Sequence, residues 1–227
     1  MEKEELYGRR IHGTFDRPGP ETLEALRGFD TSNLCDGMGN GGAMHSQIKP
    51  LIADWKIAGP AVTVRLPIGD SLLISEAVEL AREGDVIVVD AHGCMDNAVW
   101  GDLKCLACKV KKLAGVVIDG AVRDIEGIRE IGFPVFARSV TCRSSSKNNP
   151  GEINVPVSCG GVAVQPGDIV VGDEGGVVVV PPLHVGQIVA NVRKKMAWQE
   201  QMKGEILAGK FVTENFLKQM ESLGYHL

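Results

Sequence analysis

The sequence contains no long hydrophobic run and no cluster of basic residues. No apolar stretch approaches the roughly 20 residues that a membrane helix needs, so we expect no membrane association. Residues 1–10 are charged and lack an apolar core, which excludes a secretory signal and favours a cytoplasmic protein. The formal net charge is −5, and the short basic run 193–195 is typical of a solvated helix face, so we expect no nucleic-acid partner.

The sequence also lacks the second cysteine pair and the spaced histidines that would complete a zinc site. Cys105 and Cys108 form one CxxC pair, but no second pair exists and both fall inside a helical pattern. We therefore expect the six cysteines to be free thiols, as in a reducing compartment. His92 follows a predicted strand. A single histidine there is weak support for a phosphohistidine, so we interpret it as a loop or pocket residue.

The chain is long enough for one large domain. It shows no internal repeat and no low-complexity linker, so we expect a single domain over residues 1–227. Within it we expect an N-terminal arm at about residues 1–19 and a C-terminal helical tail at about residues 183–227. The first part of this tail, residues 183–207, has the pattern of one long amphipathic helix.

The central stretch, residues 84–138, alternates between strand and helix patterns. Residues 86–89 are four consecutive β-branched residues, which is typical of a strand buried on both faces. A loop is expected over residues 91–98. Helix, strand, helix and short strand are then expected at residues 102–113, 116–118, 125–131 and 135–137. This alternation predicts parallel strands joined by right-handed helical connections.

The regions that flank the centre predict further β structure. Residues 48–66 alternate loosely and predict two strands, and a helix is expected over residues 69–82. Residues 139–182 lose the helical period and show short strands separated by Gly, Pro and Asp. Three aspartates are interpreted as turn residues: Asp119, Asp168 and Asp173. The sequence therefore predicts an α/β protein with two β layers and helices.

Charged residues are set into apolar surroundings at two junctions, Gly101-Asp102 and Arg123-Asp124. Each follows a predicted strand and opens a helix, where α/β folds keep their chemistry. The first junction offers unpaired N–H groups for an anion, and its glycine lets a ligand approach the backbone. The second offers a guanidinium fork and a carboxylate of the kind that Mg²⁺ accepts. Both aspartates could instead be helix caps, and the Arg-Asp pair a local ion pair.

The spacing of these residues carries a family resemblance. Asp102 and Arg123-Asp124 are separated by 20 residues, which gives the pattern D-x20-R-D. With GDVIVVDAHG, WGDL and AGVVIDGAVRD, the stretch 30–182 resembles the 4-hydroxy-4-methyl-2-oxoglutarate / 4-carboxy-4-hydroxy-2-oxoadipate aldolases. That family also contains the regulator of ribonuclease activity A and chains once labelled demethylmenaquinone methyltransferases. The resemblance implies a three-layer β/β/α swivelling-domain (phosphohistidine-like) fold.

The resemblance also implies roles for individual residues. Arg123 would bind the keto-acid oxygens and stabilise the enolate. Asp124 would hold Mg²⁺ or Mn²⁺, and Asp102 would hold or orient a water on that metal. The backbone N–H groups of Leu103 and Lys104 would bind the pyruvate carboxylate.

The family assembles into trimers or dimers of trimers, with the site at a subunit interface. A glutamate from the C-terminal helix of the adjacent subunit completes that site, and Glu200 is the nearest candidate in this chain. One departure is Ser71, which stands where the family commonly has Asn. The substrate contacts at that position are therefore left open.

The residues and the resemblance together predict a metal-dependent, class II aldolase. It would cleave a 4-hydroxy-2-oxo di- or tricarboxylate to pyruvate and a second keto acid. Such cleavage needs a base for the 4-hydroxyl group and an electrophile for the developing enolate, which a metal ion beside a cation can supply. Decarboxylation of oxaloacetate passes through the same enolate, so we expect it as a side activity.

Three other functions are weighed against this prediction. A Schiff-base aldolase would need a desolvated lysine, and several lysines crowd one predicted helix: Lys104, Lys109, Lys111 and Lys112. A non-catalytic, protein-binding regulator of a ribonuclease is the main alternative, although the joint presence of Asp102, Arg123 and Asp124 argues against it as the sole role. A methyltransferase is least favoured, because no glycine-rich loop is followed by an acidic residue in a suitable setting.

Overall fold

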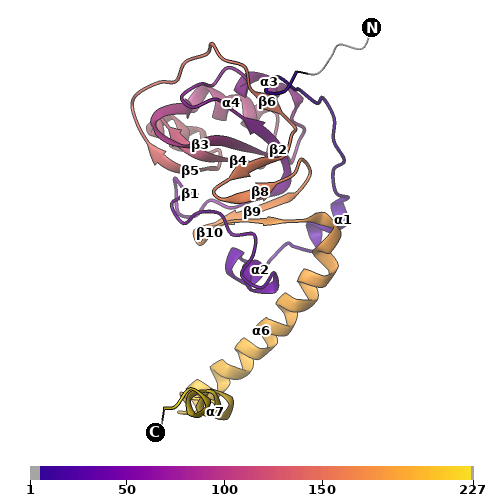
Figure 1. Cartoon of the computed structure of the whole chain (residues 1–227), viewed down its shortest axis with the longest axis vertical. Coiled ribbons are helices and arrows are strands. Elements are labelled where there is room, and N and C mark those ends of the chain that lie inside the picture. Colours follow the sequence, from indigo (N-terminus) through magenta and orange to yellow (C-terminus); the bar gives the residue numbers. More distant parts are fainter. Residues whose placement is uncertain (1–5, 226–227) are drawn as a thin grey trace.

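The computed structural model describes residues 6–225. Figure 1 shows a body of strands and helices from which one long C-terminal helix extends. The strands are β1 (Lys49–Pro50), β2 (Ile57–Arg65), β3 (Val86–Trp100), β4 (Gly115–Val122), β5 (Val135–Val140), β6 (Glu152–Ile153), β7 (Val157–Cys159), β8 (Val162–Val164), β9 (Ile169–Asp173) and β10 (Gly176–Val180). The helices are α1 (Pro20–Glu24), α2 (Thr31–Gly37), α3 (Ile74–Leu80), α4 (Asp102–Val110), α5 (Ile125–Ile131), η1 (Pro182–His184), α6 (Val185–Leu207) and α7 (Glu214–Ser222).

Strand β2 joins two β layers into one strongly curved sheet. The sheet order is β1-β5-β4-β3-β2-β9-β10, and β6 also pairs with β2. The second half of β2, from Ala61, runs parallel to β3, which is parallel to β4, as β4 is to β5. The first half, Ile57–Pro60, pairs antiparallel with β9. The hairpin β7–β8 forms a separate two-stranded sheet, and its strand β7 packs against β3 and β2.

Alternating side chains of the parallel strands enter two different cores. In β3, Ile87 and Val89 pack beneath the helices, in a core that includes residues of α3, α4 and α5. Val86 and Val88 point the other way, into a core between the two β layers. The predicted strand buried on both faces is therefore confirmed. So is the β/β/α arrangement of two β layers and a helical layer.

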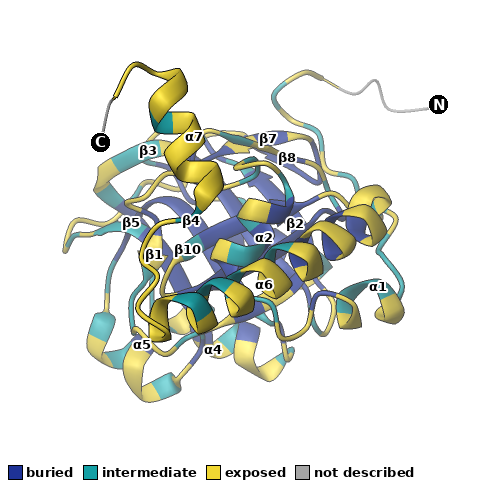
Figure 2. Cartoon of the chain, turned by 90° about the horizontal axis from the view of Figure 1, so that it is seen from below, coloured by how far each residue is buried: buried dark blue, intermediate teal, exposed yellow. Residues whose placement is uncertain are grey.

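A third core lies on the outer face of the second β layer. Val171 and Val178 of β9 and β10 pack there against Leu34 of α2 and Ile188 and Val192 of α6. Only the first half of α6 is buried, as Figure 2 shows by the change from dark blue to yellow along the helix. Helices α2 and α6 thus add a further layer to the expected three.

The N-terminal arm makes specific contacts with the body. Ile11 forms a bridge with Ile153 of β6. Arg17 donates from Nη2 to the buried carboxylate of Asp85 at 2.6 Å. Residues 1–5, the first part of the predicted arm, lie outside the described residues.

Three local expectations are wrong. Residues 91–98 are not a loop, because β3 continues to Trp100 and stays paired with β4 through several register shifts. The helix expected over residues 69–82 shortens to α3. Its expected first turn does not form, because the Ser71 N–H donates to the Ser146 carbonyl and the Leu72 N–H donates to Asp70 Oδ1. Asp119 is not a turn residue but lies buried in β4.

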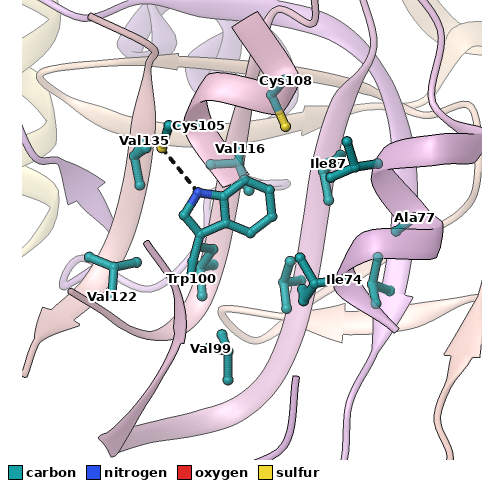
Figure 3. Close-up of a cluster of buried hydrophobic side chains, with 14 of the residues drawn as sticks. Ile74, Ala77, Ile87, Val99, Trp100, Cys105, Cys108, Val116, Val122 and Val135 are labelled. Carbon is teal, nitrogen blue, oxygen red and sulfur yellow. Dashed lines mark hydrogen bonds between the residues drawn. The ribbon is translucent and has the colours of Figure 1, made fainter. Parts of the chain in front are cut away.

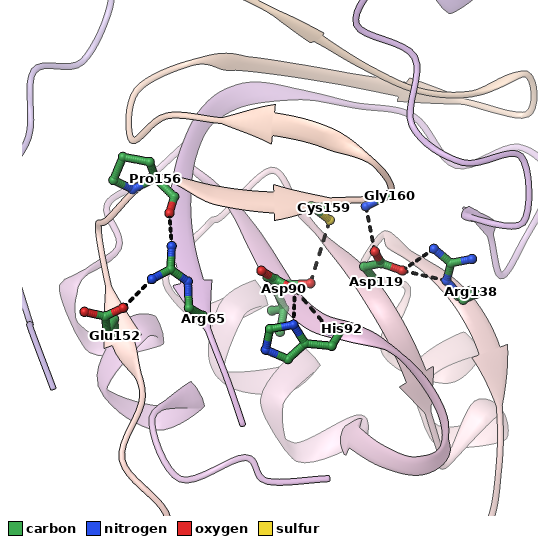
Figure 4. Close-up of polar contacts among 10 residues, drawn as sticks. Arg65, Asp90, His92, Asp119, Arg138, Glu152, Pro156, Cys159 and Gly160 are labelled. Atoms are coloured by element: carbon green, nitrogen blue, oxygen red, sulfur yellow. Dashed lines mark hydrogen bonds and ion pairs between the residues drawn. The ribbon is translucent and has the colours of Figure 1, made fainter. Parts of the chain in front are cut away.

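Asp119 belongs to a row of charged side chains across four strands (Figure 4). Arg65, Asp90, Asp119 and Arg138 come from β2, β3, β4 and β5. Arg138 Nε donates to Asp119 Oδ1 at 2.5 Å, and the Gly160 N–H in the β7–β8 turn donates to Asp119 Oδ2 at 2.7 Å. His92, within β3, places Nδ1 at 3.5 Å from Asp90 Oδ1. The row holds the β7–β8 hairpin to the parallel strands.

Candidate active site

The two charged junctions meet at one cleft, at the carboxyl ends of β3 and β4. The cleft has a volume of about 230 Å³ and lies between the first turns of α4 and α5. Its polar lining combines both junctions with a residue that precedes α3 and with residues that follow β5: Ser71, Gly101, Asp102, Lys104, Arg123, Asp124, Ser144, Ser145 and Lys147. A larger cavity of about 530 Å³ lies between α2 and the start of α6, but neither charged junction lines it. The smaller cleft therefore gathers the residues with candidate chemistry.

Asp124 adopts an uncommon backbone conformation at the start of α5. Its φ of 61° and ψ of 44° are left-handed, a region that costs most residues energy and that asparagine and aspartate tolerate best. Its side chain caps no backbone N–H of the helix. Instead, Asp124 Oδ2 accepts a hydrogen bond from Arg123 Nε at 3.0 Å. The expected cap is thus absent, whereas the local ion pair is present and lies in the cleft.

Glycines on each helix make room for the carboxylate of the other. A Cβ at Gly101 would lie 2.5 Å from Asp124 Oδ2. A Cβ at Gly127 of α5 would lie 2.7 Å from Asp102 Oδ2. Any larger residue would displace these oxygens, because real Cβ atoms do not approach other atoms this closely. The two helix starts therefore interlock, with the two carboxylates held between them.

The backbone N–H groups expected to bind a carboxylate have acceptors within the chain. Gly101 occupies the N-cap position, and Asp102 is the first helical residue. The Leu103 N–H donates to Asp102 Oδ1 at 2.7 Å, and the Lys104 N–H donates to the Gly101 carbonyl at 3.2 Å. A substrate carboxylate would have to compete for these two donors. Their assigned role stays a prediction.

Lys104 is the one lysine of the α4 group that lines the cleft. It is half-buried, and its Nζ donates to Ser75 Oγ at 2.5 Å. Burial lowers its pKa, and the charge of Lys147 lowers it further. The other three have partners outside the cleft, on the carbonyls of Ile131 and Glu79 and the carboxylate of Glu83: Lys109, Lys111 and Lys112.

The segment 141–151, between β5 and β6, forms one wall of the cleft. Its Ser145 N–H donates to the Ala98 carbonyl at 3.1 Å, and the Ser71 N–H donates to the Ser146 carbonyl at 2.9 Å. Ser145 Oγ donates to Ser71 Oγ at 2.7 Å. Here the sequence shows only the loss of the helical period, so Ser144, Ser145 and Lys147 were missed as cleft residues. No local pattern marks them, since they reach the cleft through contacts with distant strands.

Asp70 anchors this segment. The residue is fully buried, and its Oδ2 accepts from Ser146 Oγ at 2.7 Å and from the N–H groups of Asn148 and Asn149 at 2.8 and 3.1 Å. Burial alone would raise the pKa of Asp70, but its hydrogen bonds outweigh that effect and lower the pKa to about 2. Asp70 therefore stays ionised and holds the wall in place.

The CxxC cysteines are structural. Figure 3 shows Cys105 and Cys108 on α4 facing the buried indole of Trp100, whose Nε1 donates to Cys105 Sγ at 3.1 Å. Burial raises the pKa of Cys105 to about 11 and that of Cys108 to about 12. Both side chains belong to the core beneath the helices. As expected, all six cysteines are free thiols.

The donor set of the cleft fits a hard cation that keeps much of its water. Across residues 6–225, no three His, Cys, Asp or Glu side chains gather as a metal cage. The cleft nevertheless presents two carboxylates, Asp102 and Asp124. Mg²⁺ is commonly bound through one or two carboxylates while it retains several waters. The residues present therefore fit Mg²⁺ or Mn²⁺ and do not fit a closed zinc site.

Glu200 lies far along α6. It is exposed and pairs with Lys203, with 2.5 Å between its Oε1 and Nζ. In Figure 1, α6 leads away from the body, on the side opposite α3 and α4. Glu200 is not among the residues that line the cleft of its own chain. Its contribution to the site of another subunit stays a prediction.

No helix of the described residues is long and apolar enough to span a bilayer.

Comparison with known proteins shows which family the chain belongs to. The family model described as RraA-like, Aldolase/RraA, matches residues 31–179. A Halalkalibacterium halodurans protein with the provisional name 4-hydroxy-4-methyl-2-oxoglutarate aldolase is 39% identical over 83% of this chain and 89% of its own. The 4-hydroxy-4-methyl-2-oxoglutarate aldolase of Thermus thermophilus is 33% identical over 66% of this chain and 92% of its own.

A solved structure shares both fold and sequence with this chain. Streptomyces coelicolor RraAS2, described as an unusual member of the RNase ES inhibitor RraA family, superposes with a TM-score of 0.75. It is 31% identical, over 84% of this chain and 99% of its own. The relatives thus carry the names of both aldolases and ribonuclease inhibitors. On the family match and these identities, the chain belongs to the RraA-like family.

Proposed function

We propose that the protein is a metal-dependent aldolase that cleaves 4-hydroxy-2-oxo di- or tricarboxylates and releases pyruvate. The supporting observation is the interlocked pair of helix starts, which brings Asp102, Arg123 and Asp124 to one cleft. Relatives named as aldolases support a lyase. Candidate substrates are 4-hydroxy-4-methyl-2-oxoglutarate and 4-carboxy-4-hydroxy-2-oxoadipate.

Arg123 is suited to bind the keto-acid end of the substrate. Its side chain is 42% exposed, and Nε is the one guanidinium atom for which the described chain provides a partner, Asp124. The remaining N–H groups can donate to the C1 carboxylate and C2 carbonyl oxygens in the planar geometry that guanidinium favours. Negative charge grows on the C2 oxygen as the bond breaks, so these donors stabilise the transition state more than the substrate.

Asp124 would hold Mg²⁺ or Mn²⁺, with Asp102 beside it. When bound, the ion acts as a Lewis acid that polarises the C2 carbonyl. The carboxylate of Asp102 would orient a water that accepts the proton of the 4-hydroxyl group. The C3–C4 electron pair then moves into the C2 carbonyl, the second keto acid leaves, and the pyruvate enolate takes up a proton at C3. Oxaloacetate would lose CO₂ through the same enolate.

Pyruvate release tests this proposal directly. The purified protein is assayed with each candidate substrate and with oxaloacetate, with Mg²⁺ or Mn²⁺ and again after EDTA. We expect turnover that EDTA abolishes and that Arg123→Ala reduces by at least about 1,000-fold, as for the loss of a main charge-stabilising group. Arg129→Ala, at an exposed position of α5, the helix that follows Arg123, is the matched control and should retain activity. Activity that persists in EDTA or in Arg123→Ala would contradict the mechanism.

A ribonuclease-binding role is the second candidate. The likeness to RraAS2 favours it, because that protein is described within an inhibitor family. Size-exclusion chromatography with an RNase E-type enzyme would reveal a stoichiometric complex. Such a complex, together with no turnover of any keto acid, would reverse the order of the two proposals.

A further inference from the structure

Two lysines face the cleft without an anionic partner. Lys104 comes from α4 and Lys147 from the segment 141–151. Lys104 Nζ bonds to the neutral Ser75 hydroxyl, and within residues 6–225 neither ammonium pairs with a carboxylate. Both residues line the same cleft. Two like charges that repel each other in a cleft are stabilised when an anion binds between them.

The backbone of Lys147 is fixed on both sides. Before it, Ser146 donates to Asp70 through its hydroxyl group and to the Gly69 carbonyl through its N–H at 2.8 Å. After it, the N–H groups of Asn148 and Asn149 donate to the same Asp70 oxygen. The long side chain of Lys147 therefore starts from a defined position at the rim of the cleft. Such preorganisation reduces the entropy lost when a charged ligand binds.

The rest of this wall is polar but neutral. Ser71 and Ser145 share a hydrogen bond and present hydroxyl groups to the cleft. Arg123 and Asp124 occupy the junction on α5, where the keto-acid end of the substrate is proposed to bind. The fragment on the far side of the cleaved bond would then extend along the wall that carries the two serines and two lysines.

We infer that Lys147, together with Lys104, selects substrates that carry a carboxylate on the fragment beyond the cleaved C3–C4 bond. This inference rests on the proposed function, since it assumes that the keto-acid end binds at Arg123. It assigns the specificity of the cleft to residues outside the D-x20-R-D pattern. It also explains why the segment 141–151 is held so firmly by a buried carboxylate.

The inference is tested by binding, without turnover. 2-Oxoglutarate and 2-oxopentanoate share a five-carbon 2-oxo acid skeleton, but only the first has a distal carboxylate. Isothermal titration calorimetry should show that the wild-type protein binds 2-oxoglutarate about tenfold or more tightly than 2-oxopentanoate. Lys147→Gln should reduce the ratio of the two dissociation constants to near one, and Lys147→Arg should keep this ratio at its wild-type value. Lys112→Gln, on α4 but outside the cleft, is the matched control and should also keep it.

The result separates the inference from the proposed function. Equal binding of the two acids by the wild type, or an unchanged ratio in Lys147→Gln, would overturn the inference. A ratio that behaves as expected in a protein that releases no pyruvate would support the anion-selective wall and refute the aldolase. In an active enzyme, Lys147→Gln should also lower the preference for 4-carboxy-4-hydroxy-2-oxoadipate over 4-hydroxy-2-oxopentanoate, measured as the ratio of kcat/KM values.

Discussion

Asp124 combines a strained backbone with a side chain directed at the cleft. Its left-handed φ of 61° favours Gly, Asn and Asp over other residues. We therefore expect Asp124→Asn to retain the stability of the wild type, whereas Asp124→Ala should be less stable than Asp124→Asn by about 1 kcal/mol. Both variants should lose aldolase activity, because neither retains the carboxylate. Urea unfolding and pyruvate release measure the two effects separately.

The matched control for Asp124 is Asp96, which is exposed and has no left-handed φ. Asp96→Ala and Asp96→Asn should differ little in stability and should both remain active. If Asp124→Ala proved as stable as Asp124→Asn, the backbone of this residue would not be strained in solution.

Gly101 illustrates a constraint of space and not of backbone angle. Its φ of −155° is accessible to any residue, but an added Cβ would lie 2.5 Å from Asp124 Oδ2. We expect Gly101→Ala to fold normally and to lower kcat/KM by about 100-fold, because a shift of about 1 Å in a catalytic group can cost that much. Gly186→Ala, where an added Cβ meets nothing within 4 Å, should be fully active. Wild-type rates in Gly101→Ala would show that the position of Asp124 is not critical.

At the scale of elements, Asp70 links the cleft wall to the body. Its pKa is lowered from 3.8 to about 2 in the folded protein, so the ionised carboxylate stabilises the fold at pH values above about 4. This contribution is lost as the pH falls toward 2. Asp70→Asn should therefore be less stable than the wild type by about 2 kcal/mol at pH 7, and the difference should narrow between pH 4 and pH 2.

Urea unfolding at pH 7 and below pH 4 measures this difference. Asp54→Asn is the control, because Asp54 is exposed, and it should match the wild type at each pH. Hydrogen exchange should also show faster opening of residues 144–149 in Asp70→Asn. A stability difference that stayed constant from pH 7 to pH 2 would exclude the ionised carboxylate as its cause.

The elements that the sequence predicted well are those with local signals. Residues 86–89 are β-branched, and Gly132 ends α5 in the left-handed conformation with a φ of 68°. All three parallel strands and both helices of the central stretch were therefore found. The two charged junctions line one cleft, because the carboxyl ends of neighbouring parallel strands meet at one edge of the sheet.

The elements that the sequence predicted poorly depend on distant contacts. Asp70 and Ser146 are 76 residues apart, and their hydrogen bond is part of what prevents a helix from starting at residue 69. The second half of β3 shows no regular alternation of apolar and polar residues, because its pairing with β4 shifts register three times. Lys147 was missed for the same reason, since nothing near it in the chain indicates a ligand wall.

At the scale of the whole molecule, the C-terminal tail lacks cover within its own chain. The second half of α6 and all of α7 are free of buried residues. Large apolar side chains are exposed along this part, among them Leu207 at 88% and Phe211 at 79%. Exposed apolar surface of this kind is typical of subunit contacts. A neighbouring subunit could cover this surface, but the trimer or dimer of trimers stays a prediction.

If Glu200 completes the cleft of a neighbouring subunit, inactive variants should complement one another. Arg123→Ala and Glu200→Ala should each be inactive as pure oligomers. After mixing and subunit exchange in equal amounts, about a quarter of the sites would combine an intact Arg123 with an intact partner Glu200. We therefore expect about a quarter of wild-type pyruvate release. Mixing Arg123→Ala with Asp102→Ala should restore nothing, because both residues line the cleft of one chain. A Glu200→Ala oligomer that is itself active, or a mixture that stays inactive, would exclude Glu200 from the shared site.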